Sequence, residues 1–209
     1  MRDLTTQIDK QSRLTMPEGR TPIPKGNARS SGYNRQADDW YQEPRRAVDA
    51  LLEVEEFDGV IYEPACGGGN IPEACHARRL PVVGSDIRNR GWPHTILGDF
   101  LVPLWHARPP FNHIVTNPPF KLGVEFALRG LELTCGKVCI LQRTVWLEGA
   151  RRYQALFSKG HLMRVWQFRS RVSMPPGGTD VPAQGGSLSF AWFVFSRSHV
   201  GPWTGGWLP

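Results

Sequence analysis

Short apolar segments alternate with helix-length segments from Trp40 onward, and this alternation limits the possible folds more than any other feature of the sequence. The apolar segments predict seven strands, at 60–62, 82–86, 96–97, 113–115, 138–141, 163–168 and 188–195. The intervening segments predict helices after Pro44 and over 71–79, 122–134 and 149–158. Strands and helices that alternate at this spacing build an α/β fold, with a doubly wound and mostly parallel sheet.

Residues 1–35 differ in composition from the rest of the chain. They carry seven basic side chains against three acidic ones and show no sustained apolar period. Such a segment cannot bury enough apolar surface to offset the entropy of ordering it, so we predict a flexible basic arm. Residues 36–209 have the length of a single domain with one core. The net charge of +6 is compatible with a polyanionic partner.

Membrane and metal signals are both missing from the sequence. No segment approaches the roughly 20 apolar residues of a membrane span, and the first ten residues lack the apolar core of a secretory signal. The sequence therefore predicts a cytoplasmic protein with no membrane partner. The four cysteines form no metal-binding spacing with the six histidines, so no metal site is predicted. No pattern determines the oligomeric state.

Glycines and carboxylates follow the first three predicted strands. The loop Glu63 to Gly69 (EPACGGG) allows a tight turn and a close approach to a ligand, but it lacks the spacing of dinucleotide and phosphate loops. Asp86 ends the second strand, where an acid can accept hydrogen bonds from ribose hydroxyls. Asp99 and Phe100 follow the third strand, where a carboxylate can bind an exocyclic amine beside a ring. Because ligands bind beyond the carboxyl ends of parallel strands, these groups predict a pocket for a nucleoside joined to a positively charged group.

The segment NPPF follows the fourth predicted strand, at Asn117, Pro118, Pro119 and Phe120. The two prolines fix the backbone and carry no N–H, so the turn presents carbonyl oxygens and the Asn117 amide at a rigid position. Phe120 adds a flat aromatic face. An aromatic amine, such as N6 of adenine, needs two acceptors and a stacking surface of this kind. We therefore predict these four residues as the catalytic set.

The order EPACGGG, Asp86, GDF and NPPF resembles the S-adenosylmethionine-dependent adenine-N6 DNA methyltransferases of bacteria and their phages, over about residues 40–195. The resemblance implies the class I methyltransferase fold, a Rossmann-like sheet of seven strands with one antiparallel strand, and S-adenosylmethionine as cofactor. The segment from Trp40 to Pro44 (WYQEP) resembles the family segment that precedes the first strand and closes over the methionine carboxylate of the cofactor. The family often has Thr where this chain has Glu43. The residues implied to bind the cofactor are Tyr41, Glu63, Ala65, Gly67, Gly69, Asp86, Asp99, Phe100 and Asn117.

The resemblance also implies that the target base leaves the duplex and stacks on Phe120. A further stacking aromatic is expected near the sixth strand, with Trp146, Trp166 and Phe168 as candidates. The chain after Phe120 is too short for a large recognition domain, which predicts little built-in sequence recognition. Instead, loops at 143–152 and 169–186 would contact phosphates. The residues predicted at this nucleic-acid surface are Lys121, Arg143, Arg151, Arg152, Arg169 and Arg171.

Three functions fit these motifs. Adenine-N6 methylation of DNA is favoured over RNA, because the sequence contains no recognisable RNA-binding module. Amino-methylation of an RNA base could use the same pocket. A non-catalytic partner subunit is the third possibility, and the intact glycine loop and NPPF segment argue against it. No strand or helix is predicted for the aromatic tail, residues 201–209.

Overall fold

The structure is a computed structural model that describes residues 39–102, 111–180 and 188–209. The predicted basic arm, 1–35, and part of the predicted loop at 169–186 lie outside these ranges. The α-helices are α1 (Arg45–Val54), α2 (Asn70–Ala77), α3 (Gly123–Leu133) and α4 (Ala150–Ala155). The strands are β1 (Ile61–Glu63), β2 (Val82–Asp86), β3 (Ile96–Leu97), β4 (His113–Thr116), β5 (Lys137–Arg143), β6 (Leu162–Phe168), β7 (Phe190–Ser196) and β8 (Thr204–Leu208). No helix in the described ranges combines the length and the apolar character that crossing a bilayer requires.

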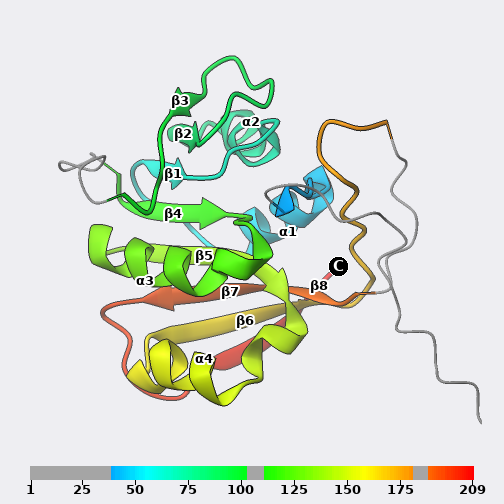
Figure 1. The fold of residues 1–209 in the computed structure, drawn as a ribbon. Coiled ribbons are helices and arrows are strands. Elements are labelled where there is room, and N and C mark those ends of the chain that lie inside the picture. The colour runs from blue at the N-terminus through cyan, green and yellow to red at the C-terminus, as the bar shows by residue number, and fades with distance from the viewer. Residues whose placement is uncertain (1–38, 103–110, 181–187) are drawn as a thin grey trace, which may run out of the picture. The chain divides into compact units, whose positions relative to one another are not determined.

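The strands form one sheet in the order β3-β2-β1-β4-β5-β7-β6-β8 (Figure 1). Strands β1 to β5 pair in parallel, β7 runs antiparallel to both β5 and β6, and β8 pairs in parallel with β6. The predicted α/β fold with a mostly parallel sheet and one antiparallel strand is therefore confirmed for the described residues. The predicted number of strands is wrong, because the sheet has eight strands rather than seven. The tail supplies the eighth, β8, by pairing with the edge of β6.

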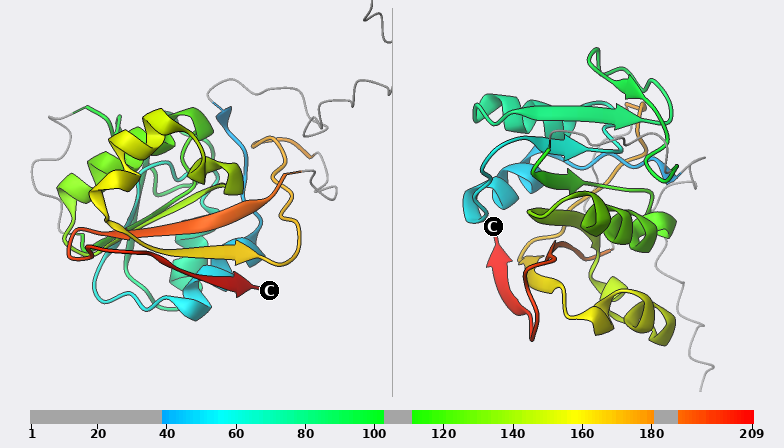
Figure 2. Two further views of the ribbon diagram at one scale, coloured as in Figure 1. Left: turned by 90° about the horizontal axis from the view of Figure 1, so that it is seen from below. Right: turned by 90° about the vertical axis from the view of Figure 1, so that its left-hand side faces the viewer.

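Both faces of the sheet are covered. Figure 2 (left) shows α3 and α4 on one side of the sheet and α1 and α2 on the other. Successive side chains of the central strands alternate between two cores, as the strand period of two requires. The core beside α1 and α2 contains Val115, Cys139, Leu141, Trp192 and Val194, and the core beside α3 contains Ile114, Val138, Ile140, Phe193 and Phe195.

The order in which strands are added to the sheet reverses at β1. From β1 it extends outward to β2 and β3, and it then returns to add β4 and β5 on the other side of β1. The carboxyl ends of β1 and β4 therefore flank a topological switch point, the usual ligand crevice of such sheets. The glycine loop follows β1, and the NPPF segment follows β4. Because β7 is antiparallel, its first residue, Phe190, lies at the same edge, opposite Arg143 of β5.

Candidate functional site

Two cavities lie at this edge of the sheet and share Asp39 and Tyr41 in their walls. The smaller one, here called the glycine-loop cavity, has a volume of about 140 Å³ and is lined by Ala65, Cys66, Gly67 and Gly68 of the loop. The larger one, the aromatic pocket, has a volume of about 970 Å³. The shared wall means that Tyr41 separates two spaces that could hold two different ligands.

Positive backbone angles shape the glycine loop. Gly67 has φ +51°, and its N–H donates to Asp86 Oδ2 at 3.0 Å, which joins the ends of β1 and β2. Gly69 has φ +92° and immediately precedes α2. A Cβ on Gly69 would lie 2.3 Å from the Trp92 ring, so this glycine packs against Trp92 and is not part of the cavity lining. Both conformations are costly for residues other than glycine.

Glu63 at the end of β1 is fully buried behind this loop. Its Oε1 accepts hydrogen bonds from Ala65 N at 2.9 Å and from Thr116 Oγ1 at 2.7 Å. Its Oε2 is buried and has no hydrogen-bond partner within the described residues. Burial therefore raises the pKa of Glu63 well above its usual value, and the nearby Glu43 carboxyl raises it further. Glu63 is not part of the cavity lining.

Asp86 and Asp99 both line the glycine-loop cavity. Both carboxylate oxygens of Asp86 already accept hydrogen bonds from the protein. Oδ1 accepts from Arg88 N at 3.1 Å and from Arg90 Nε at 3.2 Å, and Oδ2 accepts from Gly67 N. Asp99 Oδ1 accepts from Leu101 N at 2.9 Å. A ribose hydroxyl that binds Asp86 would therefore either share the carboxylate with Arg90 or displace the Arg90 side chain from it.

Phe100, which follows Asp99, reaches the cavity wall from the core. It is 1% exposed and packs against Tyr62 at 5.9 Å and Phe126 at 4.9 Å between ring centroids. Its ring is thus held by two other aromatic rings, and only a small part of its surface faces the cavity.

Trp40 covers the glycine loop. A Cβ on Gly67 would lie 2.9 Å from the Trp40 Nε1 atom, and the Arg90 guanidinium lies 4.6 Å from the centroid of the Trp40 ring. The segment around Trp40 is held in turn by the loop after β6: Gln42 N donates to Pro175 O at 2.9 Å, and Gly177 N donates to Trp40 O at 3.0 Å. Residues 40–42 and 175–177, here called the strap, therefore form one hydrogen-bonded unit, in which residues 40–42 line the cavity and residues 175–177 support them.

The Asn117 amide lines the same cavity from the NPPF segment. Its Nδ2 donates to Tyr41 O at 2.9 Å and to Glu43 Oε2 at 2.8 Å. Its Oδ1 is buried and accepts no hydrogen bond within the described residues. A buried acceptor without a donor costs free energy unless a ligand supplies one, so this oxygen marks a binding position for an N–H group.

The other three residues of the NPPF segment surround the Asn117 amide. Pro118 is buried, Pro119 lines the glycine-loop cavity, and the Pro119 carbonyl accepts from Leu122 N at 2.8 Å. Phe120 lines the aromatic pocket, and its carbonyl accepts from Gln142 Nε2 at 2.9 Å. The four residues thus lie at the boundary between the two cavities.

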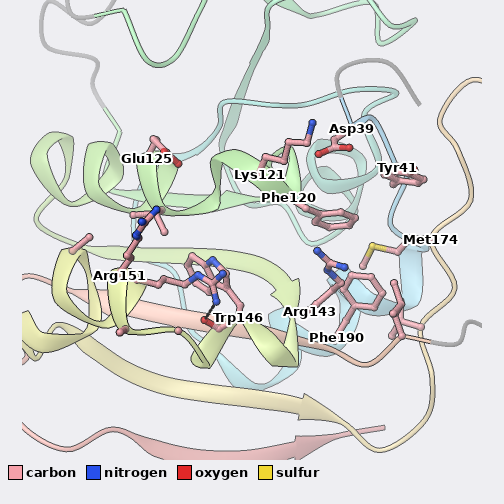
Figure 3. A pocket seen from close by; sticks show the side chains of 17 residues that line it. Asp39, Tyr41, Phe120, Lys121, Glu125, Arg143, Trp146, Arg151, Met174 and Phe190 are labelled. Atoms are coloured by element: carbon pink, nitrogen blue, oxygen red, sulfur yellow. Dashed lines mark hydrogen bonds between the residues drawn. The ribbon is translucent and has the colours of Figure 1, made fainter. Parts of the chain in front are cut away.

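Aromatic rings gather around Phe120 in the larger pocket (Figure 3). Tyr41 stacks on Phe120 with a centroid distance of 5.6 Å and an interplanar angle of 14°, and Phe190 lies 5.6 Å from it at 39°. The Arg143 guanidinium lies 5.7 Å from the Phe120 centroid. Trp146 also lines this pocket. One face of Phe120, where the sequence predicts a stacked base, is therefore covered by Tyr41.

The predicted nucleic-acid residues divide into two groups. Lys121, Arg143, Arg151 and Arg152 line the aromatic pocket, whereas Arg169 and Arg171 do not. Arg152 Nη1 donates to the carbonyls of Val145, Trp146 and Glu148, so this residue mainly holds its own loop together. Figure 3 shows Arg151 at one end of the pocket and Lys121 near its middle, above Phe120, so the positive charge is spread along the pocket.

The two other aromatic candidates lie outside the pocket. Trp166 donates from Nε1 to Glu55 Oε1 at 2.8 Å, and Phe168 belongs to the core beside α1. Sequence reasoning missed Arg90 and Phe190 as site residues. Phe190 could have been found, because the start of an antiparallel strand meets the carboxyl ends of its parallel neighbours. Arg90 carries no comparable local signal.

Comparison with known proteins supports the fold. No family model matches this chain, and no curated protein matches it. The putative RNA methyltransferase PH1948 from Pyrococcus horikoshii matches with 13% sequence identity and a TM-score of 0.51, over 74% of this chain and 80% of that chain. A chain from a structure of the conversion of a disulfide bond into a thioacetal group during echinomycin biosynthesis matches with 13% identity and a TM-score of 0.54, over 73% and 82%. These likenesses establish a Rossmann-like α/β fold of the kind found in methyltransferases.

Proposed function

We propose that this protein is an S-adenosylmethionine-dependent methyltransferase that modifies the N6 amine of adenine in nucleic acid, with DNA as the favoured substrate. The observation that carries the proposal is the buried, unpartnered Oδ1 of Asn117, at the boundary between a glycine-loop cavity and a pocket rich in aromatic and basic side chains.

The glycine-loop cavity suits a nucleoside that bears positive charge. Among its lining residues are the carboxylates of Asp39, Glu43, Asp86 and Asp99, and these would repel a phosphate. The loop offers backbone rather than side chains, because a Cβ on Gly67 would meet Trp40. At about 140 Å³ the cavity is smaller than typical ligand sites, so cofactor binding requires the cavity to widen.

The chain's own residues would then orient the reacting amine. S-adenosylmethionine, when bound, supplies a methyl group attached to a positively charged sulfur. Asn117 Oδ1 would accept a hydrogen bond from the exocyclic amine and so hold its nitrogen toward the cofactor. This arrangement draws on orientation rather than on a strong base, because the amine can lose its proton after the transfer. The aromatic pocket would receive the base, which would replace the Tyr41 ring on Phe120.

The proposal of a nucleic-acid substrate is supported by the residues that line the aromatic pocket. Lys121 and Arg151 supply charge for phosphates, and Trp146 and Phe190 supply rings. No separate recognition module occurs within 39–102, 111–180 and 188–209, which favours a short or relaxed target sequence.

The decisive experiment incubates the purified full-length chain with labelled S-adenosylmethionine and either DNA or RNA of matched random sequence. The products are then digested to nucleosides and separated. We expect N6-methyladenine from DNA. Label only in RNA would reassign the substrate to an RNA base, and the absence of label from every nucleoside would refute the proposal.

Asn117→Ala provides the first test of the site itself. Removal of the acceptor should lower the rate of methyl transfer by about 10²-fold or more, with the affinity for S-adenosylmethionine changed by only a few-fold in calorimetry. Asn89→Ala is the matched control, because Asn89 is an exposed asparagine in the loop after β2. An Asn117→Ala chain that keeps the wild-type rate would remove Asn117 from the mechanism.

A further inference from the structure

Glu43 is a buried acid held firmly beside the NPPF segment. It precedes Pro44 at the start of α1 and is 8% exposed. Its carbonyl accepts from Asn70 Nδ2 at 2.6 Å, which fixes its backbone to the start of α2. Its side-chain Oε2 accepts from Asn117 Nδ2 at 2.8 Å. Both the backbone and the carboxylate of Glu43 are thus tied to elements of the glycine-loop cavity.

The Asn117 amide has two N–H hydrogens and one oxygen. Glu43 Oε2 and the Tyr41 carbonyl accept the two hydrogen bonds from Nδ2. If the amide turned over, its Oδ1 would face these two acceptors and neither could donate to it. A carboxylate is therefore a selective partner, because it accepts only and so rejects the inverted amide.

We propose that Glu43 is a positioning residue that holds the Asn117 carboxamide with Oδ1 free for the substrate amine. The part of this inference that concerns the substrate rests on the proposed function. The part that concerns the orientation of the amide rests on the hydrogen bonds alone. Glu43 touches neither reacting atom in this role and acts through Asn117.

Burial raises the pKa of Glu43 to about 7. The other titratable side chains that line the cavity are Asp39, Cys66, Asp86, Arg90 and Asp99, and Glu63 lies behind the loop. Below this pH the protonated Glu43 could donate to the Oδ1 of an inverted Asn117 amide. The preference for one orientation would then weaken, because only the Tyr41 carbonyl would still oppose the inverted amide. The value of kcat/KM for the nucleic acid should therefore rise with pH through about 7.

The test compares Glu43→Gln with the wild type, with Glu56→Gln as the control for an exposed acid just beyond α1. Gln can donate from its own amide to the inverted Asn117, so this substitution weakens the selection without removing volume and leaves only the Tyr41 carbonyl to oppose inversion. We expect kcat about tenfold lower, a KM for S-adenosylmethionine within threefold of the wild type, and loss of the pH dependence near 7. Unchanged kcat and an unchanged pH profile would overturn the proposal.

A second measurement needs no activity. The side-chain amide of Asn117 can be followed by nitrogen-15 NMR and assigned by its loss in Asn117→Asp. We expect its signals to titrate with a midpoint near pH 7 in the wild type and to stay constant in Glu43→Gln. A constant signal in the wild type would overturn the role of Glu43 whatever the activity. A titrating signal in a chain that transfers no methyl group would instead support the orientation and refute the proposed function.

Discussion

Glu43 and Glu63 are carboxylic acids placed where burial disfavours their charge. Because the pKa of Glu43 is raised to about 7 in the folded protein, the folded state binds its proton more tightly than the unfolded chain does. The stability that this provides is fully present below the unfolded pKa of about 4.5 and is lost as pH rises toward 7. For Glu43 the loss is about 3 kcal/mol.

This linkage gives a prediction for stability. The free energy of unfolding of Glu43→Gln relative to the wild type should increase by up to about 3 kcal/mol between pH 4.5 and pH 8. Urea denaturation at several pH values measures the difference, and the effects of groups that do not interact with Glu43, such as the lowered pKa of Glu55, cancel in it. Glu56→Gln serves again as the control. If the free energies of unfolding of Glu43→Gln and the wild type changed in parallel with pH, Glu43 would not be the source of the pH-dependent stability.

The residues that could be predicted from sequence are those that directly follow an apolar strand. Asp86, Asp99 and Asn117 all lie at strand ends, and all three line one cavity. Their partners could not be predicted, for two different reasons. Arg90 is only four residues after Asp86, but it lies in an irregular loop that gives no period from which the contact follows. Glu43 lies 74 residues before Asn117 and meets it across the switch point, which sequence order does not reveal.

At the scale of elements, most strands and helices follow from apolar periodicity, and β8 is the exception. Its sequence, TGGWL, contains two glycines and no alternating apolar pattern. It forms a strand because the edge of β6 offers free backbone groups and the core beside α1 accepts one large side chain, Leu208. Tertiary contact thus overrides a weak local preference.

Neighbouring residues of β8 should therefore differ sharply in their contribution to stability. Leu208 is 0% exposed and Trp207 is 72% exposed. Leu208→Ala should lower the free energy of unfolding by about 2–5 kcal/mol, because it leaves a cavity. Trp207→Ala should change it by about 0.5 kcal/mol or less. Urea denaturation of the two variants measures both effects, and equal losses would mean that β8 does not dock as described.

At the scale of the whole molecule, charge on the aromatic pocket should govern how the polymer binds. Neutralising one phosphate contact reduces the salt dependence of binding by about one unit of slope. We expect this reduction for Lys121→Ala and for Arg151→Ala, measured by titration of a fluorescent oligonucleotide at several salt concentrations. Lys159→Ala is the control, because Lys159 is exposed but does not line the pocket. Equal slopes for all three would exclude a polymer path across this pocket.

The strap has a consequence for successive rounds of turnover. Trp40 and Gln42 are hydrogen-bonded to the loop after β6, so the strap connects the wall of the glycine-loop cavity to Met174 in the wall of the aromatic pocket. A polynucleotide that presses on the wall of the aromatic pocket would hold the strap shut over the spent cofactor. Under the proposed function, exchange of cofactor would then wait until the polynucleotide leaves, so we expect distributive methylation, with one methyl group per encounter. A dilution-chase assay on an oligonucleotide with two target adenines would reveal this as singly methylated product.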